Sequence, residues 1–403
     1  INTVMQNAGK QASSAKIDCD TELINQIMEY IQGISEVKSY NLIGKQTKRL
    51  NAANEACVRA NVKMELVYVP YHFLQSVVTK LTGAAIIGLS AYFYINGSMS
   101  VLYAVGMSIA AFMLYGSLET MGTFSSLIHV VSVCVDKANA VLGLDTMDID
   151  GKELNPENHD IEVKNIEFSY DKRKIIDGIS LSIPEKTTTA IVGPSGGGKT
   201  TLCNLIARFW DVDSGEITLG GTNVKDYSMN SLMNNFSFVF QNVYLFADTI
   251  ENNIKFGRPE ATHEEVVEAA KKACCHDFIS KLPDGYNTVI GEGGATLSGG
   301  EKQRISIARA IMKDSPIIIL DEATANVDPE NEKELTLAVD ALTKEKTIIM
   351  IAHRLKTVRH ADQIVVVDQG RIAQKGTHEE LMKQDGIYRR FVDSRELAVS
   401  WKI

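Results

Sequence analysis

The sequence predicts an α-helical transmembrane segment followed by an α/β domain, and three observations lead to this prediction. Residues 81–118 form a run of 38 residues without a charged side chain. An acidic, polar stretch separates this run from a second half, in which short apolar runs alternate with helical patterns. A glycine-rich motif of the phosphate-binding kind lies in that second half, between an apolar run and a helical pattern.

The composition excludes several classes of protein. The chain has 403 residues, of which 45% are hydrophobic and 23% charged, so it is not mainly disordered. The net charge of −9 and pI of about 5.5 argue against a nucleic-acid partner. The six cysteines include no Cys-x-x-Cys pair, so we expect reduced thiols and neither a disulfide scaffold nor a zinc site.

The uncharged run is long enough for two membrane-spanning helices. One span needs about 20 apolar residues, and each helix fits if it extends slightly past Lys80 or Glu119. The sequence NGSMS at residues 96–100 is a turn signal. We therefore expect an antiparallel pair of transmembrane helices, Phe73–Ile95 and Val101–Leu118, with helix continuing to Leu144. The alternative is a buried hairpin in a soluble protein, which would need a very large core.

Flanking charge predicts the orientation of this pair. Five basic residues precede the first span, namely Lys45, Lys48, Arg49, Arg59 and Lys63, whereas the turn carries no charge. Positive residues stay in the cytoplasm, so we expect a multi-pass protein of the plasma (inner) membrane whose second half is cytoplasmic. The first residues carry no signal-peptide pattern. Lys80 and Glu119 are candidates for a substrate pathway, with snorkelling toward the interface as the alternative.

The expected domains are a membrane part at residues 1–144, a linker at 145–160, an α/β domain at 161–393 and a tail at 394–403. The linker is acidic and contains Gly, Pro and Asn. Apolar runs of four or five residues in the α/β domain fit buried parallel strands. The strand candidates are residues 161–170, 187–192, 236–240, 317–320, 347–352 and 364–368.

A P-loop motif is the most specific signal in the chain. It reads Gly193-Pro194-Ser195-Gly196-Gly197-Gly198-Lys199-Thr200, with a strand pattern before it and a helical pattern, which includes Thr201, after it. Glycines let backbone N–H groups surround phosphate oxygens, and the helix N-terminus adds partial positive charge. Lys199 is expected to reach the β- and γ-phosphates, and the Thr200 hydroxyl to ligate Mg²⁺. The motif predicts ATP and Mg²⁺ as ligands, with residues 193–201 in contact with the nucleotide.

An apolar strand that ends in a carboxylate supports this prediction. Residues 317–320 are Ile-Ile-Ile-Leu, and Asp321 and Glu322 follow directly. Asp321 is expected to ligate Mg²⁺, and Glu322 to orient and polarise the attacking water. The pattern is weak alone and strong beside a P-loop.

The sequence also predicts a second helix N-terminus that can bind an anion. The motif is Leu297-Ser298-Gly299-Gly300-Glu301, and a helical pattern follows it. The P-loop already binds one nucleotide. A second phosphate cradle, formed by Ser298, Gly299 and Gly300, therefore suggests that two subunits share each ATP.

Together these motifs resemble the nucleotide-binding domain of ABC transporters. LSGGE stands about twenty residues before ILDEA, downstream of a P-loop, and the resemblance covers Ile161 to about Val392. It implies that Tyr170 stacks on adenine and that Asp328 is the D-loop aspartate. Glu301 replaces the usual Gln of the signature, and no departure from the family pattern removes a catalytic group.

The same resemblance implies the catalytic residues. Gln241 corresponds to the glutamine that senses Mg²⁺ and the γ-phosphate, and His353 to the switch histidine that bonds the γ-phosphate. With Glu322 they form the expected catalytic set. The GEGG sequence at residues 291–294 stands where exporters carry a segment that meets the intracellular loops.

The membrane half resembles the exporter type of this family, in which six spans precede the ATPase. Residues 12–25 resemble the second coupling region, and residues 31–41 the start of span five. The two predicted spans would then be spans five and six, and spans one to four would be absent. The expected fold is an incomplete exporter-type helical segment joined to a P-loop NTPase domain of ABC type.

The expected function is ATP-driven transport by alternating access, as an exporter of lipid, peptide or drug-like molecules. The expected partners are the lipid bilayer and a second half-transporter, identical or different. One alternative is an exporter-fold importer of siderophore type. Another, from a different class, is a soluble ABC ATPase without a transport role.

Overall fold

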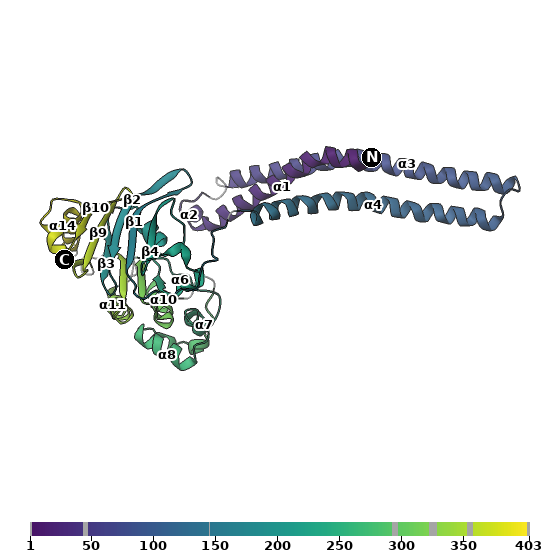
Figure 1. Ribbon diagram of the computed structural model, residues 1–403. Helices are drawn as coiled ribbons and strands as arrows, with labels where there is room; N and C mark the ends of the chain where they lie inside the picture. The colour runs from purple at the N-terminus through teal and green to yellow at the C-terminus, as the bar shows by residue number, and fades with distance from the viewer. Residues whose placement is uncertain are drawn as a thin grey trace. The chain divides into compact units, whose positions relative to one another are not determined.

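The computed structural model describes residues 2–42, 47–144, 146–291, 297–321, 329–352 and 358–400. These residues form two units, Ile1–Asp145 and Thr146–Ile403. The boundary lies within one residue of the expected start of the linker. We describe each unit by itself (Figure 1).

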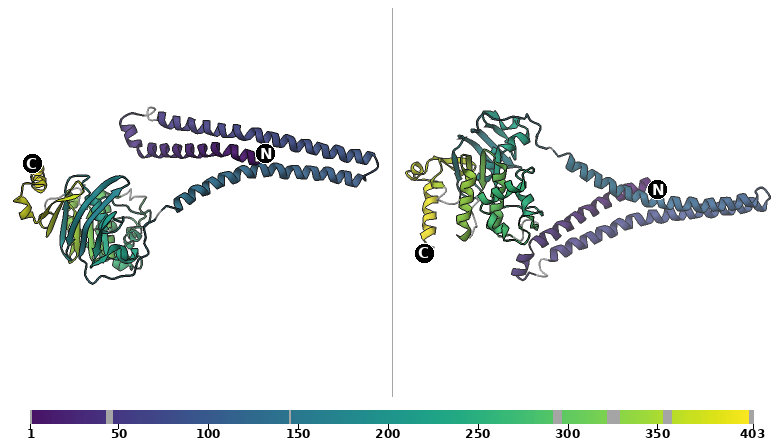
Figure 2. Two further views of the ribbon diagram at one scale, coloured as in Figure 1. Left: turned by 45° about the horizontal axis from the view of Figure 1, so that its top comes forward. Right: turned by 90° about the horizontal axis from the view of Figure 1, so that it is seen from below.

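The first unit consists of helices. Their bounds are Asn2–Gln32 (α1), Ile34–Ser39 (α2), Thr47–Ile95 (α3) and Val101–Leu142 (α4). Helices α3 and α4 run side by side from the tight turn at residues 96–100, and α1 lies along α3 (Figure 2). Two polar contacts attach α1 to its neighbours: the Cys57 thiol donates to Asp20 Oδ1 at 2.8 Å, and Lys137 Nζ lies 3.4 Å from Asp18 Oδ1.

The predicted hairpin is present at the predicted residues. The first helix of the pair ends at Ile95 and the second begins at Val101, with Gly97 at φ 71° in the turn. Helix α3 contains a stretch, within Lys48–Ile95, that is long and apolar enough to cross a membrane. The described side chains of α4 give a shorter apolar stretch, Val101–Met113.

Pro70 interrupts the hydrogen-bond ladder of α3, a helix of 49 residues. Proline has no N–H, so the carbonyl of Leu66 cannot receive its usual intrahelical bond. The charged side chains of the helix precede this point, except for Lys80.

The prediction of a coupling region at residues 12–25 is wrong. These residues lie inside α1, and residues 31–41 do not begin the next long helix. The segment is polar, but it contains no proline or glycine that would end a helix. The first break comes at Gly33, and α2 ends before Asn41, whose φ is 51°. Helix α3 begins at Thr47, so the chain reverses direction between Gly33 and that residue.

The second unit contains two sheets. The antiparallel sheet has four strands in the order β2-β1-β4-β5, with bounds Arg173–Ile183, Ile161–Tyr170, Ser214–Leu219 and Thr222–Asn223. The other sheet has six strands in the order β10-β9-β3-β8-β7-β6. Its bounds are Arg371–Gly376, Gln363–Asp368, Thr188–Val192, Thr347–Ile351, Ile317–Asp321 and Phe236–Val239.

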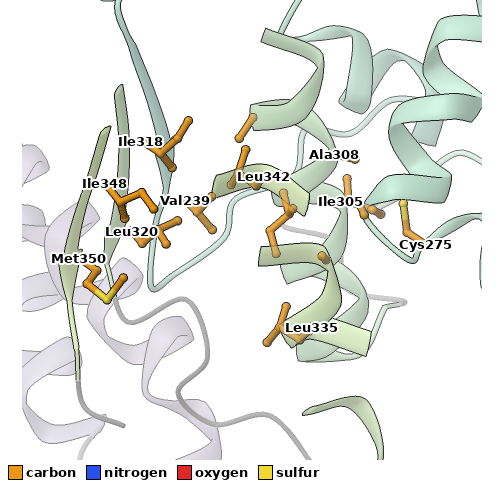
Figure 3. Close-up of a cluster of buried hydrophobic side chains, with 14 of the residues drawn as sticks. Val239, Cys275, Ile305, Ala308, Ile318, Leu320, Leu335, Leu342, Ile348 and Met350 are labelled. Carbon is orange, nitrogen blue, oxygen red and sulfur yellow. The ribbon is translucent and has the colours of Figure 1, made fainter. Parts of the chain in front are cut away.

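Five of the six strands in the larger sheet are parallel, and β10 is the antiparallel edge strand. Their apolar runs predicted this arrangement, because parallel strands are covered on both faces. One face packs on helices: Figure 3 shows Val239, Leu320 and Met350 with Leu335 and Leu342 of α11 (Pro329–Thr343). The other face packs on the antiparallel sheet through Ile191, Ile319 and Val365, among others.

Short helices complete the unit and carry the remaining connections. They are α5 (Lys199–Ile206), η1 (Val224–Asp226), α6 (Met229–Asn234), α7 (Ile250–Lys255), α8 (His263–Lys272), α9 (His276–Ser280), η2 (Gly285–Asn287), α10 (Gly299–Lys313), α13 (His378–Met382) and α14 (Ile387–Ser400).

Two expected boundaries need correction. The residue at which the tail was expected to begin, Ser394, lies inside α14. The linker is not a free connection either, because residues 148–154 are hydrogen bonded to the rest of the second unit. The composition of residues 145–160 predicted a loose linker. Backbone groups supply most of these bonds, and composition does not reveal them.

Candidate functional site

The glycine-rich motif connects β3 to α5 and follows a path that requires glycine. Gly193, Gly196 and Gly198 have φ values of 144°, 78° and 103°, which side chains rarely tolerate. A Cβ added to Gly193 would lie 2.0 Å from the carbonyl oxygen of Val367, at the end of β9. The neighbouring strand therefore fixes the loop against the sheet.

The loop presents unfilled donors at the start of α5. In the part of the chain that the structure describes, the backbone N–H groups of Ser195, Gly196 and Gly198 donate to no acceptor. Gly198 is the N-cap of α5 and provides no side-chain cap. Free N–H groups beside a helix N-terminus fit phosphate oxygens. The loop therefore fits the triphosphate that the motif predicts.

Lys199 places a positive charge over this loop. Its side chain is buried, and Nζ donates to the carbonyls of Gly193 at 3.0 Å and Pro194 at 2.9 Å. A buried ammonium group is unfavourable unless it has polar partners. These carbonyls bend the ammonium back over the loop, where it is placed to attract an anion.

Thr200 and Asp321, two of the residues predicted to ligate Mg²⁺, lie close together. Thr200 Oγ1 lies 3.4 Å from Asp321 Oδ2. Asp321 is the last residue of β7, and β8 separates β7 from β3. A hydroxyl and a carboxylate are oxygen ligands suited to Mg²⁺. Nearby, burial raises the pKa of the Cys203 thiol, and the charge of Asp321 adds to this shift, so the thiol stays neutral.

Tyr170 stands exposed at the end of β1, in an aromatic cluster. Its ring meets the ring of Trp210 edge to face, with centroids 5.6 Å apart at 88°, and that of Phe168 at 4.9 Å and 88°. These contacts hold the Tyr170 ring while leaving 38% of the residue exposed for stacking. Trp210 was not predicted; its signal in the sequence is an aromatic residue soon after the P-loop helix.

Ser298, Gly299 and Gly300 lie at the start of α10, which packs against α7, α8 and α11. Ser298 Oγ accepts from the N–H of Glu301 at 3.3 Å, and Glu301 Oε2 accepts from the N–H of Ser298 at 2.8 Å. This is a capping box. The glutamate of the signature therefore stabilises the helix start, and Gly299 is left exposed with open space around it.

Gln241 is exposed just beyond β6. Strand β6 pairs with β7 so that Val239 faces Leu320, which brings Gln241 to the same edge of the sheet as Asp321. Glu322, Asp328, His353 and residues 292–294 of the GEGG sequence lie outside the described residues.

Arg309 and Asn253 support the loop that follows Gln241, and neither was predicted. Arg309 Nη1 donates to the carbonyl of Tyr244 at 2.8 Å, and Nε to the carbonyl of Asn253 at 2.6 Å. The buried Asn253 side chain accepts from the N–H of Phe246 at 3.0 Å and donates to the carbonyl of Thr249 at 2.9 Å. Burial lowers the pKa of Arg309 to about 10, still far above neutral pH.

Comparison with known proteins agrees with this geometry. The family model described as ABC transporter matches residues 176–325. The chain is 40% identical over 374 residues to an ATP-dependent lipid A-core flippase of Desulfotalea psychrophila, covering 91% of this chain and 65% of the relative. It is also 40% identical over 382 residues to a Staphylococcus aureus protein named for multidrug export, an ATP-binding/permease protein, covering 92% and 65%.

A solved structure is similar over nearly the whole chain. The structure of a bacterial Atm1-family ABC exporter with ATP bound matches with a TM-score of 0.89 and 30% sequence identity. The match covers 98% of this chain and 70% of that chain. The chain thus spans 65% of the length of the two curated relatives above.

Proposed function

Because the chain belongs to the ABC transporter family, as an exporter-type half-transporter, we propose that it binds and hydrolyses ATP to drive transport across a membrane. The observation that carries the proposal is the distance of 3.4 Å between Thr200 of the P-loop and Asp321. This pair joins a phosphate-binding loop to a carboxylate, as Mg²⁺-dependent phosphoryl transfer requires.

The P-loop residues bind and orient the nucleotide. The N–H groups of Ser195, Gly196 and Gly198 supply donors for phosphate oxygens, and Lys199 adds a positive charge where negative charge is highest. Thr200 and Asp321 would hold Mg²⁺, with Gln241 as a further ligand. When bound, the metal neutralises charge on the phosphates. Tyr170 supplies an exposed ring for the adenine.

Glu322 and His353, together with Gln241, complete the proposed reaction. Glu322 follows Asp321 directly, so its carboxylate is suited to orient the attacking water and accept its proton. His353 donates to the γ-phosphate. Gln241 responds to the γ-phosphate at the edge of the sheet. The support for Glu322 and His353 is their position in the sequence, directly after Asp321 and shortly after β8.

We further propose that two half-transporters work as a pair. Each ATP lies between the P-loop of one subunit and residues 298–300 of the other, with Asp328 beside this interface. The exposed, unobstructed Gly299 at the start of α10 supports this role. ATP favours the closed pair and thereby shifts the equilibrium of the membrane helices between two states.

Export is the direction that the relatives favour. They are named as a flippase and as proteins of export, so the importer alternative is not favoured. The proposed substrates are lipid, peptide or drug-like molecules. The proposed site of action is the plasma (inner) membrane, with the nucleotide-binding unit in the cytoplasm.

The soluble ATPase alternative conflicts with α3, whose apolar stretch is largely exposed. Membrane fractionation separates the two functions. An exporter sediments with membranes and needs detergent for extraction, whereas recovery in the soluble fraction would contradict the transport proposal.

The decisive test of the site is Glu322→Gln. This change keeps the shape of the side chain and removes the base, so we expect ATP binding to persist while hydrolysis falls roughly 100-fold. Glu157→Gln, an exposed change in the linker, is the matched control. Steady-state hydrolysis that is unchanged in Glu322→Gln would refute the assignment.

A further inference from the structure

The segment Asp148–Leu154, which we name the strap, is bound along the second unit. Its backbone pairs with the segment after β5: the N–H of Lys152 donates to the carbonyl of Asp226, and the N–H of Ser228 to that of Lys152, both at 2.8 Å. The N–H of Leu154 donates to Ser231 Oγ at 3.0 Å. The strap is therefore part of the folded nucleotide-binding unit.

Close contact at Gly151 confirms how tightly the strap lies. A Cβ added there would come within 2.1 Å of the Tyr227 carbonyl oxygen and 2.5 Å of the backbone nitrogen of Ser228. Any residue with a side chain would lift the strap from its seat. Gly151→Ala is therefore a local way to loosen it.

The buried side chain of Arg208 binds the start of the strap. Its side chain is only 3% exposed. Nη2 donates to the carbonyl of Asp148 at 2.6 Å, and Nε to Asp211 Oδ1 at 3.0 Å. Nη1 faces the carbonyls of Val224, Lys225 and Tyr227 at 3.3, 3.3 and 3.4 Å. Every nitrogen of the guanidinium thus has an acceptor, which is the condition for burying this charge.

The position of Arg208 connects this fastening to the nucleotide site. Helix α5 has eight residues, begins at Lys199 and ends at Ile206, so it is a rigid rod of about 12 Å. Arg208 follows two residues later, in a left-handed conformation with φ 56°. This short helix therefore joins the P-loop directly to Arg208.

The chain also connects the strap to helix α4. Helix α4 ends at Leu142, six residues before Asp148, and six residues span at most about 20 Å. A short tether therefore joins the strap to α4. We propose that Arg208 is a positioning residue that ties the P-loop helix to the strap, so that nucleotide binding acts on α4 through this tether. This inference rests on the proposed function and adds a residue to it.

The test measures how α4 responds to nucleotide in the full chain. Cys134 is an exposed native cysteine on α4, whereas Cys57, Cys203 and Cys275 are buried. With Cys19 and Cys274 replaced by Ser, a nitroxide label on Cys134 reports local mobility by electron paramagnetic resonance. Spectra are recorded without nucleotide and with a non-hydrolysable ATP analogue and Mg²⁺, at concentrations that direct binding shows to be saturating.

The labelled parent and the Glu157→Ala control, which alters the linker beyond the strap, should both change their spectra on saturation. Arg208→Lys keeps the charge but loses the planar set of donors, and Gly151→Ala displaces the strap itself. We expect both variants to bind the analogue and to lose most of the spectral change. Gly151→Ala keeps the test valid if Arg208→Lys does not fold.

The other outcomes overturn one of the two proposals. A spectral change of parental size in variants that bind the analogue would refute the role of Arg208. Loss of saturable binding in both variants, with the control intact, would refute it too, because Arg208 would then only maintain the fold. If the parent binds the analogue without any spectral response at Cys134, both the proposed role of Arg208 and the proposed coupling of ATP to the membrane helices are refuted. If the parent binds no analogue, the proposed function itself fails.

Discussion

The hydroxyl of Thr200 lies 3.4 Å from Oδ2 of Asp321, although 121 positions separate the two residues in the chain. Thr200 belongs to α5, directly after the P-loop, and Asp321 ends β7. Parallel strands with their carboxyl ends at one edge of the sheet produce this meeting. It places two side-chain oxygens, both proposed as ligands of Mg²⁺, at the phosphate-binding loop.

Removing one of these oxygens should abolish most of the activity. Thr200→Ala deletes a proposed ligand of Mg²⁺, so we expect ATP hydrolysis to fall roughly 100-fold and half-saturation to need more Mg²⁺. Thr200→Ser keeps the hydroxyl and should retain most of the rate. Hydrolysis is measured as a function of Mg²⁺ concentration, and equal Mg²⁺ dependence in both variants would contradict the assignment.

The fluorescence of Trp210 should change when a nucleotide stacks on Tyr170. The ring centroids are 5.6 Å apart, so a base stacked on Tyr170 changes the surroundings of the indole. In a chain whose second tryptophan is removed by Trp401→Phe, ATP should quench the emission of Trp210. Tyr170→Ala should weaken ATP binding and reduce the quench at saturation, whereas Tyr40→Ala, in the other unit, should leave both unchanged.

Arg309→Lys should destabilise the nucleotide-binding unit. Arg309 reaches the carbonyls of Tyr244 and Asn253 through two different nitrogens, Nη1 and Nε, whereas lysine has one nitrogen and lacks this planar set of donors. We expect a loss of about 1–3 kcal/mol in the free energy of unfolding by urea. Arg389→Lys alters an exposed ion pair with Asp385, so its effect should be close to zero. Equal stability of the two variants would contradict the role of Arg309.

Stability at alkaline pH should depend on Tyr388. Burial raises the pKa of Tyr388 to about 12 from its ordinary 10.0, and its hydroxyl lies 2.7 Å from His378 Nδ1. Because the unfolded chain loses this proton first, the stabilisation is complete below about pH 10 and is lost as pH rises toward 12. The stability difference between the parent and Tyr388→Phe should therefore shrink over this interval in urea unfolding. A constant difference from pH 8 to 11.5 would contradict it.

The parts of the fold that the sequence predicted are those with continuous apolar runs or clear turn residues. Strand β7 was predicted to within one residue because four apolar residues precede its carboxylate, and the turn at 96–100 contains Gly97 at positive φ. Strands β2, β4, β5 and β10 were not predicted. Strand β2 has buried residues between more exposed ones, and β10 alternates exposed and partly buried residues, so their polar positions resemble loops. The coupling region was misplaced because polarity does not end a helix.

The candidate site likewise contains residues that could be predicted from the sequence and residues that could not. The P-loop and Asp321 could be predicted because their chemistry is written in contiguous side chains. Arg208, Arg309 and Asn253 could not be predicted, because most of their partners are backbone carbonyls or N–H groups. Any residue supplies such a group, so no side-chain pattern marks it. The predicted roles of Glu322, Asp328 and His353 stay predictions.

Pro70 divides α3 into two rods of different character. The carbonyl of Leu66 already lacks its intrahelical donor, so a change of angle at this point breaks no existing backbone bond. Elsewhere along the 49 residues of α3, bending must stretch bonds that are formed. Curvature imposed on the helix therefore concentrates at one step of the backbone, and the apolar rod beyond it can tilt as a rigid body.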